Sequence, residues 1–318
     1  MNCNAPAYYI DESVEQAMKD TRDTIEHVKN IDPKYDLISP IVTPRFAVSC
    51  TSELLFELGK LAKEEDLPIQ THISENVAEI DFVSDLFPED GCYTKVYDNA
   101  GLLTNRTILA HAVHITKPEL KLISKRGAKV SHCPVSNSSL GSGMAKVREI
   151  LDAGVDVGLG TDVSGGYSTS VLESARQALL VSRLVANLHK EDRAKLSVAE
   201  ILYLGTLGGA KVMGLQDKIG NFAVGKEWDA IMVGLNEVPI PNDEEGDANE
   251  NLEDDPGVTG NVDIFEGQSN WEDILAKWVY TGDDRNNLCV WVKGRLVHDK
   301  RKGVINVGGG ASGLSLLN

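Results

Sequence analysis

Residues 68–76 read Pro-Ile-Gln-Thr-His-Ile-Ser-Glu-Asn, and this stretch decides the fold. It begins as a short apolar run, which is typical of a buried strand, and it ends in a polar cluster that contains His72. Helical patterns such as Ser52–Glu65 and Ala145–Ala153 separate it from similar runs elsewhere. Those other runs are Leu37–Val42, Thr107–Ala110, Ala128–Ser131 and Val155–Gly160. The alternation of strand and helix predicts parallel βα units.

Polar residues follow each of these runs where the strand would end. They are Thr43-Pro44-Arg45-Phe46, Thr71 to Glu75, His111 to His114, His132-Cys133-Pro134 and Thr161-Asp162. Polar chemistry at the carboxyl ends of successive parallel strands is the active-site pattern of a (β/α)8 barrel. A doubly wound sheet also binds ligands at this edge, but no Gly-x-Gly-x-x-Gly motif follows any strand here. We therefore predict an α/β fold of the TIM-barrel type.

The predicted barrel is only partial. Five strands can be counted, whereas a complete barrel has eight strands in about 250 residues. The segment before residue 36 reads mainly as one helix, Asp11–Val28. We assign residues 1–219 to this partial barrel and 220–302 to a small β-rich region, with strands in Phe222–Val233 and Leu288–Val297. An acidic, disordered insertion is expected at about 237–271 and a flexible tail at 303–318.

Composition excludes several classes of protein. The 318 residues carry a formal net charge of −17, which argues against nucleic acid and anionic membranes as partners. No apolar run approaches the roughly 18 residues of a transmembrane helix, and the first residues lack the pattern of a secretory signal. The five cysteines are scattered and form no Cys-x-x-Cys pair. We expect a reduced, cytoplasmic protein.

Four polar residues at strand ends could carry chemistry: His72, Glu75, His111 and Asp162. Imidazoles and a carboxylate on rigid strand ends suit a zinc ion. A carboxylate beside the metal supplies the proton transfer that metal-assisted hydrolysis needs. Any one of them taken alone could equally be a hydrogen-bonded polar side chain at a strand end with no catalytic role. Their recurrence at successive strand ends favours a site, because buried titratable groups are costly unless paired or liganded.

Here the sequence resembles the amidohydrolase superfamily. The stretch Thr71–Asn76 is similar to the fifth-strand motif of its deaminases, Ser131–Leu140 to the seventh and Leu159–Gly166 to the eighth. Pro44-Arg45-Phe46 narrows the resemblance to the guanine deaminase branch. The match covers nearly the whole chain apart from the acidic insertion and the tail. It implies that strands 4–8 of the barrel are present.

The resemblance implies a role for each site residue. His72 and Asp162 would bind one Zn²⁺ ion, and Glu75 would shuttle protons during the hydrolytic deamination of guanine to xanthine and ammonia. His111 and Asp162 would orient the attacking water, and His111 would also contact the substrate. Arg45 would donate hydrogen bonds to the purine and Phe46 would pack on its ring; without the resemblance, Arg45 reads as a surface cation.

The sequence departs from the superfamily in one respect. The first strand of the family ends in His-x-His, which supplies two further zinc ligands, and no two histidines here are separated by one residue. The absence of this motif agrees with the strand count, from which we expect the first three strands to be missing. Met1-Asn2-Cys3 resembles an interior stretch of the family's chains, so we expect Met1 to be an internal methionine. Two protein ligands hold zinc far less tightly than four. We therefore expect this chain to be inactive alone.

Alternatives to a guanine deaminase remain open. One is an amidohydrolase that acts on a related heterocycle such as a triazine or a pyrimidine; Arg45-Phe46 counts against it. Another is a non-catalytic fragment that binds a full-length partner, which the missing His-x-His favours. The helix predicted at Ser170–Leu188 is apolar on much of its surface and is compatible with a homodimer interface or with packing on the barrel. Cys133 and His132 are adjacent on a strand, so they point to opposite faces and do not form a nucleophilic pair.

Overall fold

A computed structural model describes residues 3–4, 8–235, 261–264 and 270–300, which fall into two compact units, 1–220 and 221–318. The predicted acidic insertion and tail lie outside the described residues, apart from 261–264 and 270–271. The helices are α1 Val14–Ile31, α2 Ser52–Glu64, α3 Val77–Leu86, α4 Tyr93–Asn99, α5 Lys117–Arg126, α6 Pro134–Ser139, α7 Val147–Asp152, α8 Val171–His189, α9 Val198–Tyr203, α10 Gly209–Val212 and α11 Trp271–Thr281. The strands are β1 Ile69–Ile73, β2 Thr107–His111, β3 Lys129–His132, β4 Val157–Leu159, β5 Ala230–Val233, β6 Asn287–Val292 and β7 Arg295–Asp299.

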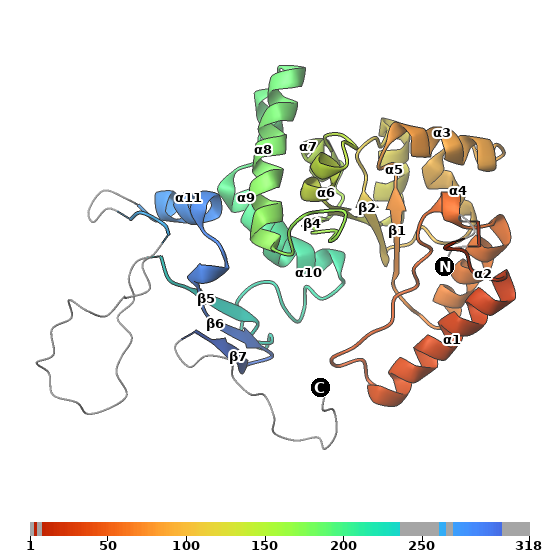
Figure 1. The fold of residues 1–318 in the computed structure, drawn as a ribbon, viewed down its shortest axis with the longest axis horizontal. Helices are drawn as coiled ribbons and strands as arrows, with labels where there is room; N and C mark the ends of the chain where they lie inside the picture. Colours follow the sequence, from red (N-terminus) through yellow and green to blue (C-terminus); the bar gives the residue numbers. More distant parts are fainter. Residues whose placement is uncertain (1–2, 5–7, 236–260, 265–269, 301–318) are drawn as a thin grey trace, which may run out of the picture. The chain divides into compact units, whose positions relative to one another are not determined.

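The first unit is built on a parallel sheet with the order β1-β2-β3-β4 (Figure 1). Each strand pairs with the next one along the chain, and helices fill every connection, so the predicted βα alternation is confirmed. The register pairs His72 with Ala110 and Ile73 with His111. All four carboxyl ends therefore lie at the same edge of the sheet, and this is the edge where the predicted site residues occur.

The strand predicted at Leu37–Val42 is wrong. Only Val42 takes part in the sheet, through an isolated bridge to Ile69. Prolines at positions 40 and 44 explain the difference, because proline has no N–H to donate and restricts the residue before it. The segment still runs beside β1, since the N–H of Gln70 donates to the carbonyl of Val42 at 2.9 Å.

Local capping explains where the helices near the site begin. Asn76 caps α3, and its side chain and Glu79 form a reciprocal capping box with the backbone. Thr116 and Glu119 do the same for α5, which ends at Gly127 with a left-handed φ of 71°. Because α3 is fixed by Asn76, the residue just before it, Glu75, is held at the turn that leaves β1.

The core of the first unit is aliphatic. Leu54, Leu58 and Leu61 of α2 and Ile73 of β1 are all completely buried. Gly59 lies on the same helix and allows a close backbone approach: a Cβ there would lie 2.0 Å from the carbonyl oxygen of Ala100, the residue that ends α4. The absence of a side chain at this position therefore sets the distance between α2 and α4.

The second unit contains an antiparallel sheet with the order β5-β6-β7. The single strand predicted at Leu288–Val297 is in fact the hairpin of β6 and β7. Lys293 and Gly294 form its turn, both with positive φ (51° and 76°), which matches the twist that a two-residue hairpin needs. The strand predicted at Phe222–Val233 is confined to Ala230–Val233.

Helix α8 buries one face and exposes another. Ser174, Ala175 and Ala178 are buried, whereas Leu180, Leu184 and Leu188 form a row of exposed side chains at a spacing of four residues. The homodimer expected from this helix stays a prediction. Within the described residues, no helix is both long enough and apolar enough to cross a membrane.

The close approach at Gly59 gives a direct test of the packing. We expect Gly59→Ala to lower the free energy of unfolding by about 1–3 kcal/mol, because the added methyl group must displace the backbone of Ala100. Urea denaturation followed by circular dichroism measures this. Lys60→Ala, at an exposed position on the same helix, is the matched control and should change stability little. Equal stability of the two variants would contradict this account of α2 and α4.

Candidate active site

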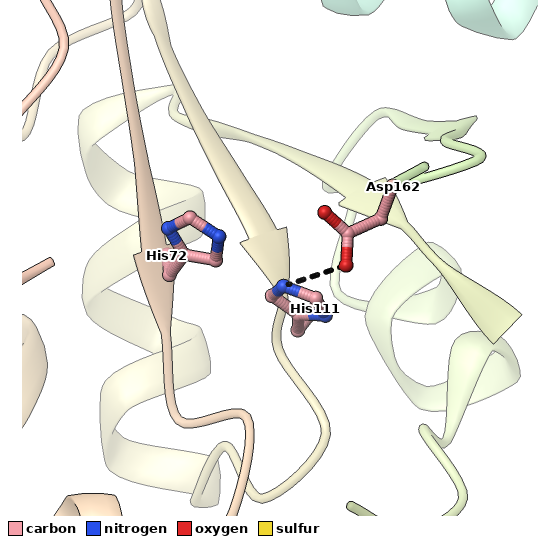
Figure 2. A group of neighbouring side chains, drawn as sticks. All are labelled: His72, His111 and Asp162. Atoms are coloured by element: carbon pink, nitrogen blue, oxygen red, sulfur yellow. Dashed lines mark ion pairs between the residues drawn. The ribbon is translucent and has the colours of Figure 1, made fainter. Parts of the chain in front are cut away.

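Three predicted residues meet at the carboxyl edge of the parallel sheet. His72 lies on β1, His111 is the last residue of β2, and Asp162 follows β4. One ligand atom from each lies within 4.8 Å of the others, and Figure 2 shows the two imidazoles and the carboxylate pointing toward one another. The two imidazole rings are stacked, with centroids 5.0 Å apart. This is the only such group of three among the residues that the structure describes.

The backbone at two of these residues is unusual. In the sheet register His72 is paired with Ala110, so alternation alone would turn His111 to the opposite face. His111 instead has a left-handed φ of 72°, and Ala112 follows with 48°. This turn brings its imidazole beside that of His72. Asp162 is also left-handed, with a φ of 46°. Non-glycine residues in this region carry strain that concentrates at functional sites.

The orientation of His72 follows from one hydrogen bond. Its Nδ1 lies 2.5 Å from the carbonyl oxygen of Arg45, and a carbonyl can only accept, so Nδ1 carries the proton. The lone pair is then on Nε2. An imidazole with one nitrogen bonded to a backbone carbonyl and the other free is the usual arrangement of a metal ligand.

His111 is oriented in the same way by a side chain. Its Nδ1 lies 2.8 Å from Oδ1 of Asn137, which makes Nδ1 the donor. Its Nε2 is buried and has no hydrogen-bond partner. This nitrogen faces two carboxylate oxygens, Oε2 of Glu75 at 3.8 Å and Oδ2 of Asp162 at 3.9 Å. Lone pairs and negative charges converging on one space fit a cation.

Glu75 is held at both its side chain and its backbone. The hydroxyl of Ser142 donates to Oε1 of Glu75 at 2.8 Å, which leaves Oε2 directed toward His111. Its backbone N–H donates to Oε2 of the buried Glu79 at 2.7 Å. His114 supports this arrangement by donating from Nε2 to the carbonyl of Ser142 at 2.7 Å.

One glycine leaves room for the carboxylate of Asp162, and a second leaves room for the backbone just before it. A Cβ on Gly165 would lie 2.7 Å from Oδ2 of Asp162, and one on Gly166 would lie 2.3 Å from the carbonyl of Thr161. Any larger residue at position 165 would therefore push the carboxylate away from its place. Steric constraints therefore explain why both positions of the Gly165-Gly166 pair are glycine.

Arg45 and Phe46 lie next to His72, one of the three residues in this group. The guanidinium of Arg45 is 5.4 Å from the ring centroid of Phe46 and 5.6 Å from that of Tyr9, and the Phe46 ring meets the His72 ring edge-on at 6.0 Å. A cavity of about 400 Å³ is lined by Arg45, His72 and Asp162 among others. This volume suits a small ligand.

His132 and Cys133 point into different cavities, as strand alternation predicts. Cys133 lines the cavity of about 400 Å³ that His72 also lines. Burial raises the pKa of its thiol to about 12, so the thiol keeps its proton at neutral pH. His132 lines a separate cavity of about 110 Å³ next to α7 and α8. Burial, and then the neighbouring His111, lower the pKa of His132 to about 3.

The structure also supplies residues that no sequence argument had assigned a role. Asn137 orients His111, and Gly165 leaves room for Asp162. Glu75 is held by two further residues, Ser142 and Glu79. Asn137 and Gly165 lie inside recognised motifs, so the sequence carried a signal for them. Ser142 and Glu79 lie just outside the motifs.

Comparison with known proteins places the chain in a family. Residues 3–297 match the sequence profile of the Amidohydrolase family. A probable guanine deaminase from Schizosaccharomyces pombe is 47% identical over 297 residues, covering 93% of this chain and 53% of that protein. The guanine deaminase from Mus musculus is 41% identical over 300 residues, covering 93% of this chain and 61% of that protein. The chain thus spans a little over half the length of the curated relatives it matches.

Solved structures agree. Guanine deaminase from E. coli superposes with a TM-score of 0.78 at 30% identity, covering 94% of this chain and 62% of that one. Guanine deaminase from C. acetobutylicum with guanine bound in the active site gives a TM-score of 0.78 at 32% identity, covering 93% and 63%. Triazine hydrolase variants, at 21–22% identity, share the fold alone.

Buried His132 predicts a pH dependence of stability. Its folded pKa of about 3 lies below the ordinary value of 6.5, so below pH 6.5 the unfolded chain binds a proton that the folded chain does not. This contribution to stability is complete above pH 6.5 and is lost as the pH falls toward 3, by about 1.4 kcal/mol per pH unit. Urea denaturation of the metal-free chain from pH 7.5 to 5 measures it.

The slope of the free energy of unfolding against pH should become shallower in His132→Leu. It should stay unchanged in His27→Asn, which alters an exposed histidine. A wild-type slope in His132→Leu would contradict a neutral, buried imidazole.

Proposed function

The chain belongs to the amidohydrolase family, and from that premise we propose that its site binds zinc and catalyses the hydrolytic deamination of guanine to xanthine and ammonia. One observation carries the proposal. The donor atoms of His72, His111 and Asp162 lie within 4.8 Å of one another, beside a cavity that Arg45 also lines. The five cysteines are scattered and form no Cys-x-x-Cys pair, which fits a reducing compartment, and we propose the cytosol.

The residues present fit a zinc ion. Nε2 of His72 and the carboxylate of Asp162 would hold it, with the lone pair of His111 beside them. Neutral imidazole nitrogen and carboxylate oxygen are both zinc ligands. When bound, zinc lowers the pKa of a coordinated water and makes a nucleophile available at neutral pH.

Glu75 is placed to move protons. Its Oε2 faces the centre at 3.8 Å from Nε2 of His111, while Ser142 holds the other oxygen. Glu75 would accept a proton from the attacking water and deliver it to a ring nitrogen of guanine while the water oxygen bonds to C2. It would then take the remaining proton from that hydroxyl and pass it to the amino group, which would leave as ammonia when its bond to C2 breaks. His111 and Asp162 would orient the water, since both present acceptors toward it.

Arg45 and Phe46 would bind the purine. Arg45 has donors for the acceptor atoms of guanine, and the Phe46 ring offers an aromatic face next to His72. Stacked contacts with Phe46 and Tyr9 hold the guanidinium in place before substrate arrives. The relatives of known structure include a guanine deaminase with guanine bound, and this supports guanine as the substrate.

Guanine binding tests the assignment of Arg45. We expect the zinc-loaded chain to bind guanine and Arg45→Ala to weaken binding by about 10- to 100-fold, because an Ala side chain leaves the purine acceptors unpaired. Equilibrium dialysis measures this. Arg22→Ala, at an exposed position on α1, is the control and should bind like the unsubstituted chain. If the affinity for guanine is the same with and without zinc, and the same in Arg45→Ala as in the unsubstituted chain, the proposed function is contradicted.

Ammonia release from guanine tests the role of Glu75. The sequence has no His-x-His pair, so we expect the chain alone to be inactive or to keep only a residual rate compared with an enzyme with four protein ligands. Whatever rate is measured with zinc should fall at least about 100-fold in Glu75→Gln, because the amide cannot shuttle a proton. It should persist in Glu89→Gln, at an exposed position. Equal rates in both variants would refute the proton-transfer role.

A further inference from the structure

Tyr97 on α4 belongs to no motif that resembles the family's, yet it is completely buried next to the site. Its ring packs against that of Tyr93 at 5.4 Å. Burial raises the pKa of the Tyr97 phenol, so its hydroxyl keeps its proton and can donate. A buried hydroxyl must find partners, and the partners of this one are informative.

The Tyr97 hydroxyl uses all of its hydrogen-bonding capacity. It donates to the carbonyl of His72 at 2.8 Å. It accepts from the backbone N–H of Ala47 at 3.0 Å and from the hydroxyl of Thr71 at 3.0 Å. A phenol offers one donor and two acceptor positions, so these three bonds satisfy it. The Tyr93 hydroxyl is farther away, at 3.4 Å, and donates instead to Glu79 at 2.7 Å.

These bonds join two segments that are distant in sequence. Ala47 directly follows Arg45 and Phe46, and His72 is the residue whose Nε2 faces the metal position. On one side the carbonyl of Arg45 accepts from the N–H of His72 at 3.2 Å and from its Nδ1 at 2.5 Å. On the other side the single oxygen of Tyr97 bonds both segments. The spacing between them is therefore fixed at two points.

We propose that Tyr97 is a positioning residue that sets the place of the Arg45–Phe46 pair relative to His72. The proposal rests on the proposed function, in which Arg45 and Phe46 bind the purine and His72 binds zinc. It follows that one buried hydroxyl couples the affinity for the metal to the affinity for the substrate. Loss of the hydroxyl leaves the buried N–H of Ala47 without its acceptor, and the segment must move to find another.

Tyr97→Phe is the test, since it removes one oxygen and keeps the ring. In the metal-free chain we expect amide hydrogen exchange at Ala47 to become at least about 10-fold faster, because its acceptor is gone, while exchange at Leu58 of α2 stays unchanged. Val96→Ala is the matched control: it trims a buried neighbour on the same helix and leaves the hydroxyl in place. It should lower Tm without accelerating exchange at Ala47.

Zinc affinity gives the second readout. We expect Tyr97→Phe to weaken zinc binding by about 10- to 100-fold, the usual effect of losing a group that orients a ligand, and to weaken guanine binding in parallel. Val96→Ala should bind both like the unsubstituted chain. Tyr97→Phe with unchanged exchange at Ala47, or with zinc affinity equal to that of Val96→Ala, would overturn the proposal. Failure of the unsubstituted chain to bind zinc would count against the proposed function, and exchange at Ala47 would still decide the role of Tyr97.

Discussion

The hydrogen bond from Nδ1 of His72 to the carbonyl of Arg45 constrains the whole site. Because a carbonyl only accepts, the bond fixes the tautomer of His72 and leaves its Nε2 with a lone pair. It also ties the Arg45–Phe46 segment to β1. Asn137 imposes the same tautomer on His111, so the lone pair of His111 faces the carboxylates of Glu75 and Asp162, and His72 has a donor atom in the same group as His111 and Asp162. Such a cluster is unfavourable without positive charge, and this is the physical reason to place a cation there.

The fold makes this cluster possible in a simple way. Parallel strands present their carboxyl ends at one edge, so residues far apart in sequence meet without any long loop. The left-handed backbone at His111 and Asp162 then turns the side chains inward. The helices that follow the strands also contribute: α3 fixes Glu75 by its cap, and α6 supplies Asn137. Positioning of the site therefore depends on local turns more than on the sheet itself.

Much of this could be predicted from the sequence, and the rest has identifiable causes. His72, His111 and Asp162 were predictable because each follows a short apolar run, and parallel strands bring such ends together. The strand expected at Leu37–Val42 failed because periodicity ignores the missing N–H of proline. The hydroxyl contacts of Ser142 and Tyr97 could not be predicted from the sequence. Ser142 lies 67 residues from Glu75, and Tyr97 lies 50 residues from Ala47. A serine or a tyrosine so far from its partner belongs to no local sequence pattern.

The central claim is that His72 and Asp162 hold a zinc ion at the carboxyl edge of the sheet, with His111 and Glu75 around it. Anomalous diffraction at the zinc edge, from crystals of the chain grown with zinc, tests this most directly. The account predicts one peak within about 2.0–2.2 Å of Nε2 of His72 and of a carboxylate oxygen of Asp162. A crystal with zinc bound only elsewhere, or with this edge of the sheet empty at saturating zinc, would contradict it.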